Sequence, residues 1–72
     1  MKNEATMQLT VNGKPREVDL PATLAEFLTS LNLHERLVVV ERNGEIIRRE
    51  RFGDTLLEPG DTLEIVQMMA GG

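Results

Sequence analysis

The 72-residue sequence predicts an α+β fold, in which a mixed sheet of four to five strands wraps around one helix. Two observations lead to this prediction. Short stretches that alternate polar and apolar residues lie on both sides of one helical stretch, and Asn-Gly or Pro-Gly pairs separate several of them. A chain this short forms one domain, which buries only about 60% of its unfolded surface and has little room for an enclosed active site.

The first part of the domain is predicted to be a β-hairpin. Apolar and polar residues alternate from Met7 to Val11, which is the period of a strand with one buried face. Asn12-Gly13 follows, and both residue types tolerate the positive φ angles of a two-residue hairpin turn. The alternation resumes over residues 16 to 20, with Val18 and Leu20 predicted to face inward.

One amphipathic helix follows the hairpin. Thr23 and Glu26 have the spacing of a capping box, in which each side chain accepts a hydrogen bond from the backbone amide of the other residue. Apolar residues then recur three and four positions apart and form one face that can pack on a sheet: Leu24, Phe27, Leu28 and Leu31. The helix is therefore predicted over residues 24 to 31, with Asn32 as its terminator.

A second pair of strands is predicted after the helix. Residues 37 to 41 are apolar on both faces, which favours a central strand whose second face is covered or kept for a partner. Asn43-Gly44 turns the chain, and residues 45 to 47 can form a short return strand. Residues 48 to 52 have no clear period and are predicted to be a connecting loop.

The last strand is predicted over residues 62 to 66, after a turn at Pro59-Gly60-Asp61. Leu63 and Ile65 should share its core-facing side. The order of elements is then β-β-α-β-β-β, in which the helix can cross over and place the last strand parallel beside the first. This is the β-grasp, or ubiquitin-like, architecture. We expect a disordered leader over residues 1–6, the domain over 7–67 and a flexible tail over 68–72.

Composition excludes several classes of function. The formal net charge of −4 disfavours an electrostatic grip on nucleic acid or anionic lipid. The chain has no cysteine for a disulfide, a thiolate metal site or a thiol nucleophile, and it shows no Gly-rich phosphate loop. The longest apolar run is too short to span a bilayer, and no signal-peptide core follows Met1. We therefore expect a cytoplasmic protein that binds neither nucleic acid nor membrane.

Gly71-Gly72 is the strongest indication of function. Glycine has no Cβ, so this strip of backbone can enter a narrow channel that excludes side chains. A terminal carboxylate is ionised at neutral pH, because its pKa is roughly 3.3–3.7, and it would need activation, for example as an acyl-adenylate. Taken by itself, the dipeptide is equally compatible with a frayed chain end.

Three segments in this order resemble the ThiS-like sulfur carriers of bacterial thiamine biosynthesis: Val40 to Ile47 (VERNGEII), Pro59 to Val66 (PGDTLEIV) and Gly71-Gly72. The resemblance covers nearly the whole chain from Met7 onward. It departs from the family at Arg48, because members often have proline just after the return strand.

The resemblance implies a carrier and not an enzyme. The carboxylate of Gly72 would be adenylated by a ThiF-like adenylyltransferase, and Gly71 would give it access to that active site. Sulfur from a cysteine-desulfurase relay would displace AMP and leave a thiocarboxylate. A ThiG-like thiazole synthase would then incorporate the sulfur into the thiazole ring. ATP and metal would belong to the activating enzyme, so no cofactor or metal is expected to bind this chain stably.

A partner surface is expected where the last strand meets the tail. Val66 and Met68 should form an exposed apolar patch, continued by one face of residues 37 to 40, since exposed apolar clusters mark interaction sites. The alternative is that these residues close the core against the helix. Further candidate contacts are two tail residues with small or flexible side chains and three acidic residues that could meet basic groups or remain solvated: Met69, Ala70, Glu58, Asp61 and Glu64.

Other features leave alternatives open. His34 is predicted to be an ordinary surface histidine, and Arg48, Arg49 and Arg51 could bind phosphate or an acidic partner, or form a solvated loop. Three other functions share the fold: a molybdopterin-pathway sulfur carrier, a ubiquitin-like protein modifier, and a β-grasp regulatory or RNA-binding module. The first rival tends to have prolines near the tail, which residues 65 to 69 lack.

Overall fold

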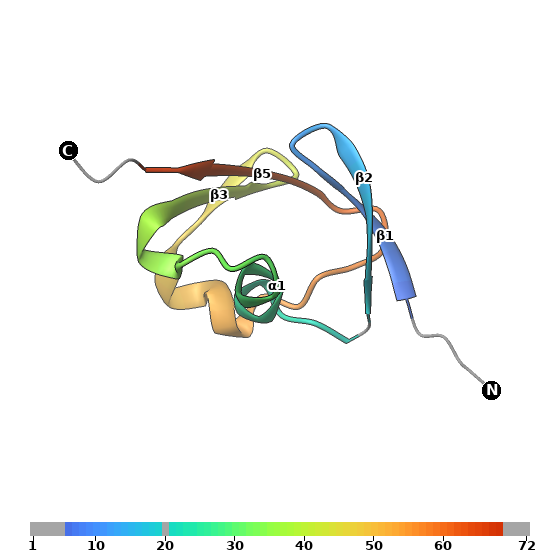
Figure 1. The fold of residues 1–72 in the computed structure, drawn as a ribbon, viewed down its shortest axis with the longest axis horizontal. Coiled ribbons are helices and arrows are strands. Elements are labelled where there is room, and N and C mark those ends of the chain that lie inside the picture. Colours follow the sequence, from blue (N-terminus) through green and yellow to red (C-terminus); the bar gives the residue numbers. More distant parts are fainter. Residues whose placement is uncertain (1–5, 20, 69–72) are drawn as a thin grey trace.

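The computed structural model describes residues 6–19 and 21–68. Within these residues, five strands form one sheet in the order β2-β1-β5-β3-β4, and one α-helix packs across one face of that sheet (Figure 1). The strands and helix are β1 (Thr6–Val11), β2 (Lys14–Asp19), α1 (Leu24–Ser30), β3 (Val38–Arg42), β4 (Glu45–Ile47) and β5 (Thr62–Gln67). The predicted β-grasp fold is confirmed.

The sheet is mixed because the chain crosses over once between β1 and β5. These two strands pair in parallel, with Thr10 opposite Thr62, whereas β1–β2, β3–β4 and β3–β5 are antiparallel. The last strand therefore lies in the middle of the sheet, between β1 and β3. β1 pairs with the first two residues of β5, and β3 pairs with β5 from Leu63 to Gln67.

The helix begins where the sequence predicts, with a capping box at its first turn. The Thr23 hydroxyl accepts a hydrogen bond from the Glu26 amide at 3.1 Å, and the Glu26 carboxylate accepts one from the Thr23 amide at 2.9 Å. α1 ends at Ser30, one residue earlier than predicted, with Leu31 as its C-cap. Asn32 follows at φ 61°, the left-handed conformation that asparagine tolerates better than most residues and that ends helices.

The core lies between α1 and the concave face of the sheet. It is built from alternate strand residues and the apolar stripe of the helix, and Leu24, Val40 and Leu63 are completely buried. The remaining members come from the strands, the helix and two later segments: Met7, Leu9, Phe27, Leu28, Val38, Phe52, Leu57 and Ile65. Val18 is half-buried against this core as predicted, whereas Leu20 lies outside the described residues.

Both Asn-Gly pairs form the predicted turns, and their side chains also hold β5. Asn12 Oδ1 accepts a hydrogen bond from the Ile65 amide at 2.7 Å, and Asn12 Nδ2 donates to the Ile65 carbonyl at 3.2 Å. Asn43 Oδ1 accepts from the Thr62 amide at 2.9 Å. Each asparagine has positive φ, so the turn and the side-chain contact are formed by the same residue.

The prediction of a connecting loop over residues 48 to 52 is wrong. They belong largely to a 3-10 helix, η2 (Arg49–Asp54), which packs against α1, and Phe52 on it is only 1% exposed. A second 3-10 helix, η1 (Glu35–Leu37), precedes β3 and contains Leu37, which was expected to begin that strand. A 3-10 helix repeats every three residues, so a single turn gives no detectable apolar period.

The ends of the domain differ slightly from the predicted limits. Thr6 belongs to β1, where it pairs with Asp19, although it was assigned to the leader. Met68 was expected to begin the flexible tail, but its amide donates a hydrogen bond to the Leu37 carbonyl at 2.7 Å. No helix among the described residues is long and apolar enough to cross a membrane.

Candidate functional site

Residues 69–72 follow a strand, β5, that several contacts hold in place. β5 is paired along its length with β3, up to Gln67 opposite Val38, and the Met68–Leu37 hydrogen bond extends this attachment by one residue. The backbone is therefore held to within four residues of Gly72. The predicted sulfur-bearing residue, Gly72, lies outside the described residues, as do Gly71, Met69 and Ala70.

An apolar surface lies near the end of β5, on the face of the sheet opposite α1. Val66 lies directly across from Val39, and residues paired in this way project from the same face. Val66 is 60% exposed and Met68 46% exposed, while their neighbours Leu63 and Ile65 are buried. The predicted exposure of Val66 and Met68 is confirmed, so these residues do not close the core.

The same face contains an apolar residue that the sequence analysis missed. Ile46 on β4 is opposite Glu41 and is 66% exposed, whereas Ile47 points inward and is half-buried. The alternation within the short return strand was the available signal. We define the outer apolar surface as the exposed residues Leu37, Val39, Ile46, Val66 and Met68.

Two of the three predicted acidic contacts are accessible. Glu64 is exposed on β5, beside the apolar surface, and Glu58 is exposed in the loop before the last turn. Glu64 is directly opposite Glu41 on β3. Like charges opposite each other destabilise a sheet. A basic group of a partner that lies against Glu41 and Glu64 would offset the repulsion between them.

Asp61 does not belong to this surface, which corrects the prediction. It is 5% exposed, and its carboxylate accepts three hydrogen bonds within the domain. Oδ2 accepts from Arg42 Nε and the Glu58 amide, each at 2.9 Å, and Oδ1 accepts from Asn43 Nδ2 at 3.0 Å. Asp61 therefore ties the turn before β5 to the turn after β3.

The charge of Asp61 is stabilised by these contacts. Burial raises the pKa of a carboxyl group, but the hydrogen bonds from Glu58 and Asn43 and the hydrogen bond and charge of Arg42 outweigh it. The pKa of Asp61 is accordingly lowered from its ordinary value. This group remains ionised at neutral pH and serves the fold.

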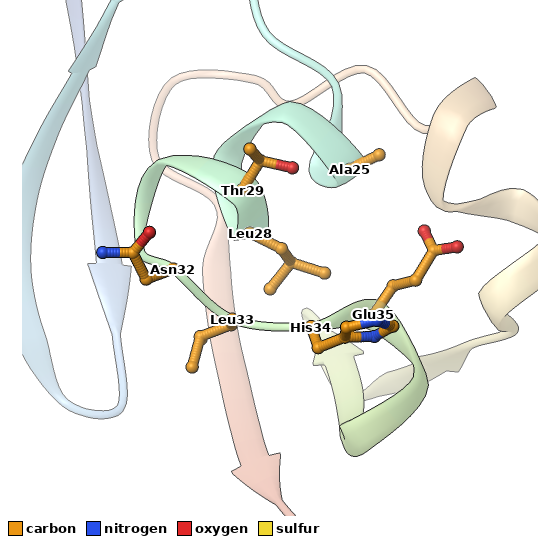
Figure 2. Close-up of a pocket in the computed structure, with 7 residues that line it drawn as sticks. All are labelled: Ala25, Leu28, Thr29, Asn32, Leu33, His34 and Glu35. Atoms are coloured by element: carbon orange, nitrogen blue, oxygen red, sulfur yellow. The ribbon is translucent and has the colours of Figure 1, made fainter.

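A groove of about 440 Å³ lies between α1 and the segment that leads to β3 (Figure 2). Leu28 and Thr29 line it from the helix, and His34 and Glu35 line it from the other side. His34 Nδ1 accepts a hydrogen bond from the Arg36 amide at 3.2 Å, so its ring caps η1. His34 is exposed, as predicted for a surface histidine, and its capping contact was not predicted.

A β-grasp domain whose central last strand leads towards a diglycine sequence has the organisation of the ubiquitin-like proteins that present a C-terminal tail to their partners. Residues 9–72 match the model of the ThiS family, so the match includes Gly71 and Gly72. The chain belongs to the ThiS family.

Three relatives agree with this assignment. The sulfur carrier protein ThiS of Bacillus subtilis is 42% identical over 50 residues, which are 69% of this chain and 76% of that protein. The crystal structure of the thiamine biosynthesis protein ThiS from Geobacter metallireducens is 42% identical, with a TM-score of 0.77, over 92% of this chain and 100% of that one. A thiazole synthase of Paramagnetospirillum magneticum is 36% identical over 92% of this chain. This chain spans only about a fifth of that enzyme's length.

Proposed function

We propose that this protein is a sulfur carrier of thiamine biosynthesis. The match to the ThiS family through Gly72 is the observation that carries the proposal. The 42% identity to the sulfur carrier of Bacillus subtilis supports it. The similarity to a structure named as a thiamine biosynthesis protein and to a thiazole synthase favours the thiamine pathway over the molybdopterin pathway. The fold is suited to this role, because β5, the strand that leads to Gly71-Gly72, is paired with both β1 and β3.

The proposed chemistry takes place at the carboxylate of Gly72. The carboxylate attacks the α-phosphate of ATP and releases pyrophosphate, which gives an acyl-adenylate. A persulfide of a cysteine-desulfurase relay then attacks the carbonyl carbon, AMP leaves, and an acyl disulfide forms. A thiol attacks the relay-side sulfur of that acyl disulfide, so the thiocarboxylate leaves and the two relay sulfurs end in a disulfide. A ThiF-like adenylyltransferase supplies the nucleotide and metal sites in this scheme. The chain itself supplies the reactive group and the surface by which partners recognise it.

A ThiG-like thiazole synthase is the proposed acceptor of the sulfur. The thiazole synthase of Paramagnetospirillum magneticum contains a segment similar to 92% of this chain, within a protein about five times as long. A carrier-like segment and an enzyme that share one polypeptide are held close together. A separate carrier of the same family would need a docking surface instead, and the outer apolar surface is suited to that purpose.

Mass spectrometry of the intact protein tests the carrier function. After incubation with a ThiF-like adenylyltransferase, ATP and a desulfurase relay, the protein should gain the mass difference between one sulfur and one oxygen atom. A variant that lacks Gly72 is the control and should gain nothing. An unchanged mass for the intact chain would contradict the proposal, and covalent adducts with other proteins would instead support a protein modifier.

The substitution Val66→Asp tests whether the outer apolar surface binds the partners. We expect affinity for the adenylyltransferase to fall about tenfold or more, because a buried unpaired charge costs well over 1.4 kcal/mol. The free energy of unfolding should change by less than about 0.5 kcal/mol, since Val66 is 60% exposed. Isothermal titration calorimetry and urea denaturation measure the two quantities.

Leu56→Asp is the matched control for that experiment. Leu56 is 56% exposed, so the same change is made at an equally accessible apolar residue, but in the loop before Leu57 and away from the outer apolar surface. It should leave the affinity unchanged. Equal losses in both variants would show that the added charge acts generally and that Val66 is not a contact.

A further inference from the structure

Arginines gather at one end of this acidic protein. Residues 35–37 and 48–51 contain four arginines and two glutamates, a net charge of +2. The overall charge is −4, so the rest of the chain carries −6. We define the basic rim as Arg36, Arg48, Arg49 and Arg51, all of which are exposed. These two segments therefore carry a positive charge within an otherwise acidic chain.

The basic rim lies at the end of the sheet from which the tail emerges. Gln67 at the end of β5 is opposite Val38, and Arg36 is two residues before Val38. Ile47 is opposite Val40, so the next two residues of the chain, Arg48 and Arg49, follow at the same end. Figure 1 shows η1 and the segment after β4 near the end of β5.

The first turn of η2 connects two of the arginines. The Arg51 amide donates a hydrogen bond to the Arg48 carbonyl at 2.8 Å, which is the closing contact of a 3-10 turn. Arg48 is the N-cap of η2 and the exposed Arg51 is its third residue, so both arginines lie in the first half of this helix.

The rim arginines have no ionic partner within the described part of the chain. The only ion pair there joins Arg42 to Asp61, and it belongs to the turn network. Guanidinium groups bind carboxylates through two parallel hydrogen bonds and lose less hydration than ammonium groups, which makes exposed arginine well suited to an acidic protein surface.

We propose that the basic rim docks against a cluster of carboxylates on the adenylating partner, at the entrance through which the tail reaches the active site. This inference rests on the proposed function. The rim adjoins Leu37 and Val39 of the outer apolar surface, so one partner can contact both. Its electrostatic attraction accelerates association and turns the tail end of the domain towards the partner before the apolar contacts form.

Association kinetics with the ThiF-like adenylyltransferase test the proposal. The double variant Arg48→Glu/Arg49→Glu should associate about tenfold more slowly at low ionic strength, with a dissociation rate within about twofold of wild type. The difference should shrink between about 0.01 M and 0.15 M salt, because the Debye length falls from about 30 Å to 8 Å. Surface plasmon resonance gives both rate constants.

Lys14→Glu/Arg16→Glu is the matched control. It changes the charge by the same amount at two exposed residues of β2, the opposite edge strand of the sheet from β4. We expect its association rate to stay within about twofold of wild type. Urea denaturation of both double variants establishes that each one is folded, and Arg48→Gln/Arg49→Gln should slow association by a smaller factor.

The possible outcomes distinguish failure of the rim proposal from failure of the carrier function. Formation of the thiocarboxylate by the wild-type chain, together with equal association rates for the two double variants, would overturn the rim proposal and leave the carrier function intact. A raised KM for ATP with unchanged association would also overturn it, because the arginines would then contact the nucleotide. If the wild-type chain forms no thiocarboxylate, the carrier function itself fails and the rim loses its partner.

Discussion

Phe52→Ala should remove much of the stability of this domain. Phe52 is 1% exposed and packs in the core with residues of α1, although it lies on the short helix η2. Removal of a buried phenylalanine side chain costs about 3–5 kcal/mol, and a domain of this size has a total stability of roughly 4–11 kcal/mol. We expect the melting temperature to fall by at least about 12 °C, as measured by circular dichroism.

Two further variants distinguish a packing effect from other causes. Phe52→Leu keeps most of the apolar volume and should cost less than about 1.5 kcal/mol. Leu56→Ala removes an apolar side chain that is 56% exposed, and it should change the stability by less than about 0.5 kcal/mol. A similar effect of Phe52→Ala and Leu56→Ala would show that η2 is not a structural part of the core.

Phe52 also illustrates what sequence patterns could not reveal. The strands and α1 were predictable because each repeats its apolar positions several times, as in Met7, Leu9 and Val11. η2 has one apolar residue in a single turn, so it has no repeat to detect. The tertiary contact with α1 determines its structure, and that contact links segments about 25 residues apart.

In the candidate site, too, residues in a repeating local pattern were predictable, and residues that depend on distant partners were not. The exposure of Val66 and Met68 followed from alternation along one strand, and the same argument would have found Ile46. The role of Asp61 depends on partners 18 and 19 residues away, Asn43 and Arg42, and no local pattern indicates such pairs. A turn aspartate normally faces solvent, which is why the prediction for Asp61 was wrong.

Asp61→Asn should destabilise the domain at neutral pH by about 3 kcal/mol. This value is at the low end of the range for a broken buried ion pair, because Arg42 keeps some access to water. The substituted amide has one oxygen in place of two acceptors, and its NH₂ group would face a hydrogen-bond donor. Arg42, Asn43 and the Glu58 amide would therefore lose part of their shared acceptor. Urea denaturation measures the difference.

The effect of Asp61→Asn should depend on pH in a defined direction. The folded state lowers the pKa of Asp61, so the wild-type carboxylate stabilises the fold above its unfolded pKa of about 3.9. This stabilisation is lost as the pH falls through the lower, folded-state pKa, because the carboxyl group then becomes protonated. The difference between wild type and variant should therefore be largest near pH 7 and decrease steadily below about pH 4.

Asp54→Asn provides the matched control for this pH dependence. Asp54 is an exposed acid at the end of η2, and its carboxylate makes no hydrogen bond to the described residues. Its substitution should have a small effect at every pH. If Asp61→Asn destabilised the domain equally at pH 7 and pH 2.5, the charge of Asp61 would not hold the two turns together. A pH-dependent difference in stability would therefore be due to the charge of Asp61, and a pH-independent difference to the shape of its side chain.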